Sequence, residues 1–162
     1  MFEKVRVEVD PQASENNCYN NCVAKAVRDG GEVVVGWRRT PATTQGGLIV
    51  SLDHHAVWRS PSGELVDISP RVAATGGQLV VITDKEIEFR PDPEATFLED
   101  GRARPSQYVP GAEDTWGLLK QACEWANSSA AHAAAGDQQK AQYANDKARA
   151  LLNQHWERVR RG

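Results

Sequence analysis

The chain has 162 residues, of which 40% are hydrophobic and 25% charged, as expected for one globular domain with at most a small appendage. The formal net charge of −3 gives no reason to expect a nucleic acid or an anionic membrane as partner. The first five residues lack the apolar run of a signal peptide, and no stretch is apolar for long enough to span a bilayer.

The first half of the chain is predicted to alternate strands with one helix. Valines alternate with polar residues over residues 2–9, which predicts a strand. A helix is predicted over Cys18–Arg28, with Asn16 or Asn17 as its N-cap and glycines 30–31 as its stop signal. Further strands are predicted at residues 32–37, 48–52, 55–59, 64–68, 78–83 and 86–89, and a loop is predicted at residues 38–47.

The character of the sequence changes after residue 92. Residues 93–112 contain several prolines and little periodicity, which predicts a linker or a surface crossing. Residues 113–162 are rich in alanine and follow helical spacing, interrupted by Gly136-Asp137, which predicts a helical hairpin. The predicted fold is α+β, with a helix packed on an antiparallel sheet in residues 1–92 and the hairpin at the C-terminal end.

The cysteines favour a thiol that stays reduced. The chain has three cysteines, an odd number, and Cys18 and Cys22 lie one helical turn apart, so a disulfide framework is not expected. We therefore expect a reducing, cytoplasmic setting. Cys22 and Cys123 fall on apolar helix faces and are expected to be inert core residues.

The turn that follows residue 59 decides which histidine meets Asp67. Pro61 suits the start of a type I turn and Gly63 suits the left-handed position of a three-residue hairpin loop. In that register His55 and Asp67 share one face of the hairpin as diagonal neighbours.

A loop that is one residue shorter or longer would instead bring His54 to the face of Asp67. That register would also place Asp67 on the face of Trp58, which otherwise belongs to a wholly apolar side of the hairpin. Because this is a poor environment for a carboxylate, we favour His55.

Cys18, His55 and Asp67 are the residue types of a cysteine-nucleophile triad. A helix N-terminus and a protonated imidazole both lower the pKa of a thiol, and Cys18 is placed to receive both effects. We expect Cys18 to act as nucleophile, His55 as general base and acid, and Asp67 as the residue that orients the imidazole. The backbone amide of Cys18 is one candidate for the oxyanion donor.

Two other interpretations concern the same segments. Cys18, Cys22, His54 and His55 have neither a Cys-x-x-Cys nor a His-x₃₋₅-His spacing, so we predict no metal and no cofactor. Trp37 is either a core residue or part of the lining of a cleft.

The order of these residues resembles transglutaminase-like and papain-like cysteine enzymes. A closer resemblance is to uncharacterised bacterial and phage proteins, some of which carry a SEC-C metal-binding tail. The matching residues are Cys18 with Asn21, Gly30-Gly31, Gly36-Trp37, His55-Ala56-Val57-Trp58, Asp67-Ile68-Ser69-Pro70 and Pro91-Asp92. They cover about residues 15 to 92.

The resemblance implies a papain/transglutaminase-like core and selects Cys18 over Cys22, because Asn21 preserves the Cys-x-x-Asn spacing. It also implies a role for Gln12, which lies six residues before Cys18, the spacing of the oxyanion glutamine in papain-like enzymes. Two positions depart from the pattern: His54 replaces an aromatic residue and Ser69 replaces threonine. No cysteine-rich tail follows, so no SEC-C zinc site is inferred.

Together these features predict a cysteine-dependent hydrolase or acyl transferase acting on an amide or isopeptide bond, whether as peptidase, deamidase or transglutaminase-like enzyme. The expected partner is a protein or peptide substrate, with no nucleic acid and no membrane involved. The alternative is a non-catalytic binding module that keeps the fold, such as a phage or bacterial protein that sequesters a host partner through the C-terminal hairpin.

Overall fold

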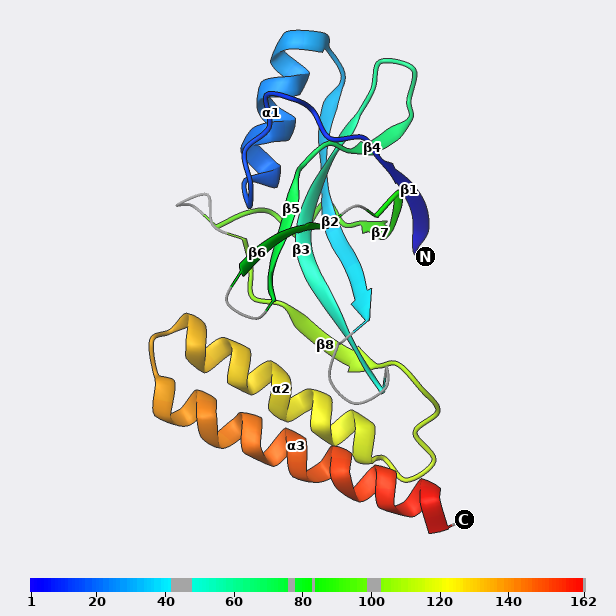
Figure 1. Ribbon diagram of the computed structural model, residues 1–162, viewed down its shortest axis with the longest axis vertical. Helices are drawn as coiled ribbons and strands as arrows, with labels where there is room; N and C mark the ends of the chain where they lie inside the picture. Colours follow the sequence, from blue (N-terminus) through cyan, green and yellow to red (C-terminus); the bar gives the residue numbers. More distant parts are fainter. Residues whose placement is uncertain (42–47, 76–77, 83, 99–102, 162) are drawn as a thin grey trace. The chain divides into compact units, whose positions relative to one another are not determined.

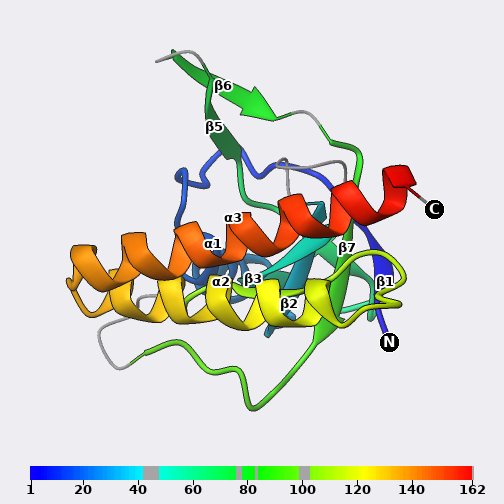
Figure 2. The same cartoon turned by 90° about the horizontal axis from the view of Figure 1, so that it is seen from below.

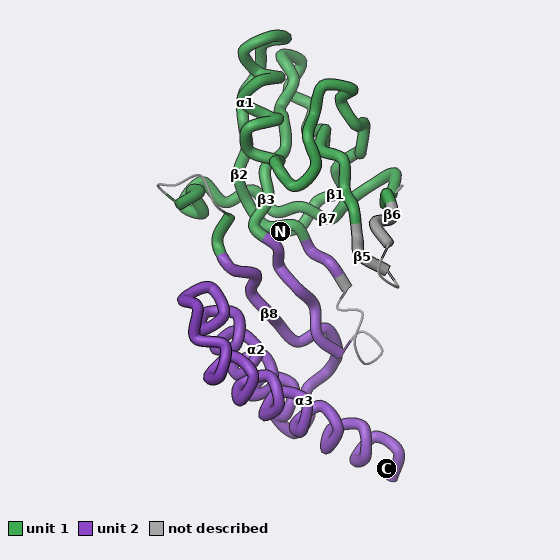
Figure 3. Tube along the Cα trace, turned by 60° about the vertical axis from the view of Figure 1, so that its left-hand side comes forward, with its two compact units in different colours: residues 1–38, 54–104 green, residues 39–53, 105–162 purple. Residues whose placement is uncertain are grey.

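The computed structural model describes residues 1–41, 48–75, 78–82, 84–98 and 103–161. The chain divides into two compact units, which are coloured separately in Figure 3. The first unit comprises residues 1–38 and 54–104, and the second comprises residues 39–53 and 105–162. Each unit has hydrophobic clusters of its own.

Five strands of the described chain close into a barrel. They are β1 (Glu3–Val7), β2 (Glu32–Pro41), β3 (Ile49–Arg59), β4 (Leu65–Asp67) and β7 (Glu86–Pro91). They pair in the order β2-β7-β1-β4-β3, and an additional pairing between β2 and β3 completes the ring (Figure 1). Strands β1 and β4 are parallel, whereas β1 with β7 and β3 with β4 are antiparallel.

The α+β class predicted from the sequence is confirmed, but the predicted papain/transglutaminase-like core, a helix on an antiparallel sheet, needs correction. The sheet closes on itself instead of staying open, and it contains one parallel pair. Parallel strands need a long crossover connection, and here the chain between β1 and β4 supplies it by way of a helix and two strands. Local alternation of residues predicts strands but carries no information on such distant pairings.

Alternating residues of β3 separate the barrel interior from its outer face. Val57 packs in the interior with Val5 of β1 and with Phe89 of β7. Ala56 faces outward and packs against Cys22 of helix α1 (Cys18–Asp29). Helix α1 therefore lies on the outer face of the barrel.

Gly36 allows β2 and β7 to approach closely. A Cβ atom at this position would lie 2.2 Å from the carbonyl oxygen of Arg90 and 2.8 Å from Cζ of Phe89. Since no side chain fits these distances without moving backbone, a glycine is required where the ring of strands closes.

The second unit contains the C-terminal helices and one short strand. Strand β8 (Gln107–Pro110) pairs with the first residues of β3, from Ile49 opposite Pro110 to Leu52 opposite Gln107. Helices α2 (Leu118–Ala134) and α3 (Gln138–Arg161) run alongside each other (Figure 2). Their shared core contains residues of both helices, the first residue of β3 and the residue before it, namely Leu119, Ala122, Cys123, Leu152, Ile49 and Leu48.

Several predicted elements are found with different limits. The predicted strands at residues 48–52 and 55–59 form the single strand β3, and β2 extends to Pro41. Two strands were not predicted: β8, within the proline-rich segment, and β5 (Arg71–Thr75), which forms a hairpin with β6 (Gln78–Ile82). The rest of the predicted loop, residues 42–47, and position 83 of a predicted strand lie outside the described residues.

The predicted helical hairpin is present, and it shares its compact unit with residues 39–53, which the sequence analysis places in the core domain. No helix in the described part of the chain combines the length and the apolar character needed to cross a membrane.

Candidate active site

Cys18 is the first residue of α1. Asn17 occupies the N-cap position but makes no side-chain cap, because its Oδ1 instead accepts a hydrogen bond from Nδ2 of Asn20 at 2.7 Å. Asn16 turns the chain into the helix with a φ of 55°, a left-handed conformation that asparagine tolerates better than most residues. The first N–H groups of a helix have no intrahelical acceptor, so the amide of Cys18 and the positive end of the helix dipole lie beside the thiol.

His55 and Asp67 meet on the interior face of the barrel. The predicted register is observed, with Trp58 opposite Val66 and Arg59 opposite Leu65. It brings Nε2 of His55 to 3.0 Å from Oδ2 of Asp67. The two atoms are within ion-pair distance, although their alignment falls outside that of a regular hydrogen bond. Both side chains are buried, and Asp67 is fully inaccessible to solvent.

The thiol of Cys18 and the imidazole of His55 shift each other's pKa. Burial opposes ionisation of the Cys18 thiol, but the hydrogen bond from His55 and its charge outweigh burial, so the pKa of Cys18 lies below its ordinary value. Burial likewise opposes protonation of His55, but the close contact with Asp67, the hydrogen bond with Cys18 and the charges of both raise its pKa to about 9. Both shifts favour a thiolate beside an imidazolium at neutral pH.

The geometry also assigns the two ring nitrogens of His55. Because Nε2 faces Asp67, Nδ1 is the nitrogen that remains for the thiol. The backbone N–H of Ala56 adds a further hydrogen bond that favours the thiolate of Cys18.

Asp67 is held as a carboxylate. Burial would raise its pKa, but the close contact with His55 and the charge of that ring lower it below the ordinary value, with help from the backbone amide of Ser69. That amide donates to Oδ1 of Asp67 at 3.2 Å, and the charge of Arg38 acts in the same direction. The buried acid is therefore ionised and able to stabilise a charged His55.

A cleft of about 170 Å³ opens beside Cys18. Its walls come from residues 16–18, 38, 54–55, 69–71 and 103, all within the first unit. His55 and Cys18 both reach this cleft, so the thiol is accessible to a small group bound there. Cys22 and Cys123 are buried, and burial raises the pKa of each, to about 12 for Cys123.

His54 is buried and has a different role from its neighbour. Its Nε2 hydrogen-bonds the carbonyl oxygen of Ala95, and its Nδ1 accepts a hydrogen bond from the backbone amide of Arg104 at 3.0 Å. Burial lowers the pKa of His54. The neutral ring thus holds Ala95 and Arg104 against β3, and it adds a wall to the cleft.

Asn21 supports the site from within α1. Its Nδ2 donates to the carbonyl oxygen of Ser14 at 2.8 Å and to Oγ of Ser69 at 3.1 Å, while its Oδ1 accepts from the amide of Ser14 at 2.9 Å. Asn21 therefore joins the loop before the nucleophile to the residue that holds Asp67.

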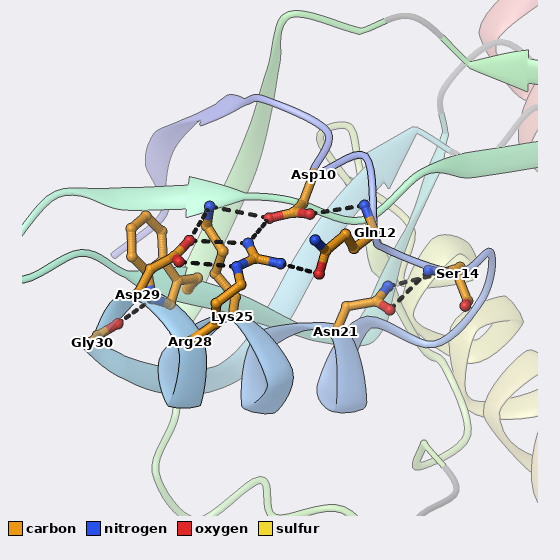
Figure 4. Close-up of polar contacts among 9 residues, drawn as sticks. Asp10, Gln12, Ser14, Asn21, Lys25, Arg28, Asp29 and Gly30 are labelled. Atoms are coloured by element: carbon orange, nitrogen blue, oxygen red, sulfur yellow. Dashed lines mark hydrogen bonds and ion pairs between the residues drawn. The ribbon is translucent and has the colours of Figure 1, made fainter.

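The structure does not bring Gln12 to the thiol. Its Oε1 accepts a hydrogen bond from Nη1 of Arg28 at 2.6 Å, near the opposite end of α1 (Figure 4). The sequence spacing that suggested an oxyanion role is therefore misleading, because Arg28 holds the Gln12 side chain away from the thiol. Of our two oxyanion candidates, the backbone amide of Cys18 lies beside the thiol.

Gln12 belongs to a cluster of charges that fixes α1 to the strand-end loop. Asp10, whose side chain is 5% exposed, pairs with both Arg28 and Lys25, and the Lys25 distance is 3.0 Å. Asp29 pairs with the same two cations. Hydrogen bonds with Arg28 and with the amide of Gln12 lower the pKa of Asp10 to about 2.

Trp37 lies behind the cleft and does not line it. The side chain is 4% exposed, its Nε1 donates to Oδ2 of Asp92 at 2.9 Å, and its ring packs on His54 with centroids 5.4 Å apart. Trp37 therefore supports a wall of the cleft through His54.

Sequence reasoning missed the cations of the cleft, Arg38 and Arg71. Both positions could have been suspected, because Arg38 follows Gly36-Trp37 and Arg71 follows the Asp67–Pro70 motif directly. The role of Ala95 in fixing His54 had no such signal, because nothing in the pattern links residues so far apart.

No group of three or more metal-binding side chains occurs among the described residues. Comparison of the chain with models of protein families, with curated proteins and with solved structures finds no match.

Proposed function

We propose that this protein is a cysteine-dependent hydrolase or acyl transferase that acts on an amide or isopeptide bond. The observation that carries the proposal is the meeting of Cys18, His55 and Asp67, in which the thiol and the imidazole shift each other's pKa toward an ion pair. Such a pair is the reactive form of a cysteine nucleophile.

The reaction would proceed through a thioester. The Cys18 thiolate attacks the carbonyl carbon, and the carbonyl electron pair moves onto the oxygen, where the amide of Cys18 stabilises the developing charge. His55 then gives its proton to the leaving nitrogen as the C–N bond breaks. Water or a second amine attacks the thioester, His55 takes a proton from it, and Cys18 is released as thiolate.

Asp67 would keep His55 oriented and charged throughout. The carboxylate is buried and ionised, and it faces Nε2, which leaves Nδ1 to exchange protons with the thiol and the leaving group. The buried position also keeps water from competing for the imidazole.

The order of the three residues along the chain, with the last two on neighbouring strands, supports a relationship to transglutaminase-like and papain-like enzymes. The nucleophile at the start of a helix supports that relationship, whereas the closed barrel on which the helix packs differs from a papain-like helix-on-sheet core. A protein or peptide substrate follows from the bond type. The need for a free thiol also favours a reducing compartment.

Acylation by p-nitrophenyl acetate tests the proposal. At pH 6.5 we expect Cys18 to be acetylated at least about 100-fold faster than N-acetylcysteine amide, since the lowered pKa of Cys18 increases its thiolate fraction. Mass spectrometry of intact and digested protein identifies the acylated residue, and the loss of the acetyl group with time reports deacylation. Faster turnover with added hydroxylamine, together with formation of acetohydroxamate, would indicate that the acyl group can pass to an amine.

The Cys22→Ala variant is the matched control, because it removes the neighbouring thiol and leaves the ion pair in place. His55→Ala should abolish the rate advantage. If the wild-type protein forms no acetyl-thioester at Cys18 faster than the small thiol, the enzyme proposal fails, and a binding module that retains the fold becomes the better account.

A further inference from the structure

The cleft beside Cys18 has two arginines among the residues that line it. Arg38 and Arg71 contribute guanidinium groups, and no aspartate or glutamate lines the cleft among the residues that the structure describes. The pKa of His55 is raised, so its ring carries a positive charge, which the negative charge of the Cys18 thiolate balances. Arg38 stands near the buried charge of Asp67. Arg71 lies outside this buried set of charges.

Arg71 has hydrogen-bonding capacity left over. Its Nη1 lies 2.8 Å from Oδ2 of Asp84, whose side chain is 53% exposed. The Arg71 side chain is 16% exposed, and its guanidinium offers five N–H donors, of which Asp84 engages one. A second anion could therefore share Arg71 with Asp84 or displace it.

The start of α1 adds to the positive potential of the cleft. Helix α1 has twelve residues, no acidic residue in its first turn and no side-chain cap at Asn17. Asn16 and Asn17 line the same cleft as the arginines. The positive end of the helix dipole and the two guanidinium groups thus act on one small volume.

We propose that the cleft binds a carboxylate, so that the substrate is an amide with an acidic group next to the scissile carbonyl. The inference rests on the proposed function and names its substrate class. A volume of about 170 Å³ accommodates one side chain of the size of aspartate or glutamate. Arginine recognises a carboxylate by paired hydrogen bonds, and this would fix the carbonyl relative to the thiol.

Two alkylating agents of nearly equal size test the proposal, namely anionic iodoacetate and neutral iodoacetamide. The quantity to measure is the rate of alkylation by iodoacetate divided by the rate of alkylation by iodoacetamide. This ratio at Cys18 is compared with the same ratio for N-acetylcysteine amide, at pH 6.5 and low salt. We expect this relative ratio to exceed one by about 5-fold or more, since a charge at about 4 Å contributes roughly 1 kcal/mol even in water. It should decrease at high salt.

Variants test whether Arg71 causes the preference for the anionic reagent. Arg71→Gln should lower the relative ratio, Arg71→Lys should retain part of it, and Asp84→Asn should raise it by releasing Arg71. Arg59→Gln is the matched control, because Arg59 pairs with Glu32 and does not line the cleft. Asp84→Asn also keeps the test valid if an Arg71 variant fails to fold.

Protection by small anions distinguishes a carboxylate from other anions. Succinate should slow alkylation of Cys18 by iodoacetamide at lower concentrations than inorganic phosphate does.

A relative ratio at or below one, or a ratio that does not respond to Arg71→Gln and Asp84→Asn, would overturn the inference while leaving the proposed function intact. Stronger protection by phosphate would also overturn it. If iodoacetamide itself reacts no faster than with the small thiol, the proposed function fails first.

Discussion

The two ends of helix α1 both concentrate charge, but they differ in how that charge is held. At its C-terminal end, Asp10 and Asp29 share Arg28 and Lys25 in a cluster of regular ion pairs and hydrogen bonds. At its N-terminal end, Cys18 and the buried His55 shift each other's pKa.

The difference shows what separates a structural cluster from a reactive one. The pKa of Asp10 is about 2 and its partners are strong bases, so the C-terminal cluster keeps the same charge at every physiological pH. The pKa of Cys18 is instead lowered and that of His55 raised to about 9, so that a proton can pass between the thiol and the imidazole. Substitutions at the two ends should therefore affect different observables.

The largest expected effect is that of His55→Ala on the reactivity of Cys18. Without the imidazolium, burial dominates and the pKa of the thiol rises, so alkylation by iodoacetamide at pH 6 should slow by about 100-fold. Residue-resolved mass spectrometry measures the rate. Asp10→Asn is the control from the other end of the helix and should change the rate by less than about 3-fold. Equal effects of the two variants would contradict the distinction between the two ends.

Asp67→Asn should lower the pKa of His55. The neutral amide removes the charge that overcomes burial, so the pKa should fall from about 9 toward or below 6.5, the ordinary value. A titration of the His55 ring protons by NMR measures this shift. The pKa of His54 should stay below its ordinary value, because its own partners are untouched. A His55 pKa that does not move would show that Asp67 does not control it.

The features of the fold and the site that could be predicted from the sequence are those that join residues close together in the chain. Proline and glycine in the 60–64 turn set the register of one hairpin, and from it the pairing of His55 with Asp67 followed. The start of α1 at Cys18 followed from the asparagines before it and from helical spacing. These features are local.

The parts that were missed involve distant segments. The parallel pairing of β1 with β4 and the hydrogen bond from His54 to Ala95 join segments far apart in the chain, and no local pattern reports them. The prediction for Gln12 failed for the same reason. Its spacing from Cys18 matched that of an oxyanion glutamine, but its side chain is hydrogen-bonded to Arg28, near the opposite end of α1.

Asp10→Asn should reduce stability without reducing reactivity. The folded pKa of Asp10 lies below the unfolded value of 3.8, so its contribution is fully present above pH 3.8 and is lost as the pH falls through about 2. We expect a loss of about 1 to 2 kcal/mol at pH 7 in urea unfolding, and a smaller decline in stability between pH 4 and 2 than in the wild type. An unchanged acid dependence would show that another carboxylate dominates it.

The smallest expected effect is that of Cys22→Ala. Cys22 is fully buried against Ala56, so its loss should reduce stability by about 1 kcal/mol. The alkylation rate of Cys18 should remain within about 2-fold of the wild type, because Cys22 takes no part in the ion pair. A large fall in that rate would mean that Cys22 helps to position the nucleophile.

The pH dependence of Cys18 alkylation in the wild-type protein tests the central claim most directly. Iodoacetamide labelling is measured from pH 4 to pH 10, and mass spectrometry separates Cys18 from the two other cysteines. We predict that the rate at Cys18 rises with a midpoint below that of an ordinary thiol, which lies near 8.5. A midpoint at or above that of an ordinary thiol would contradict the thiolate–imidazolium pair, and with it the proposed function.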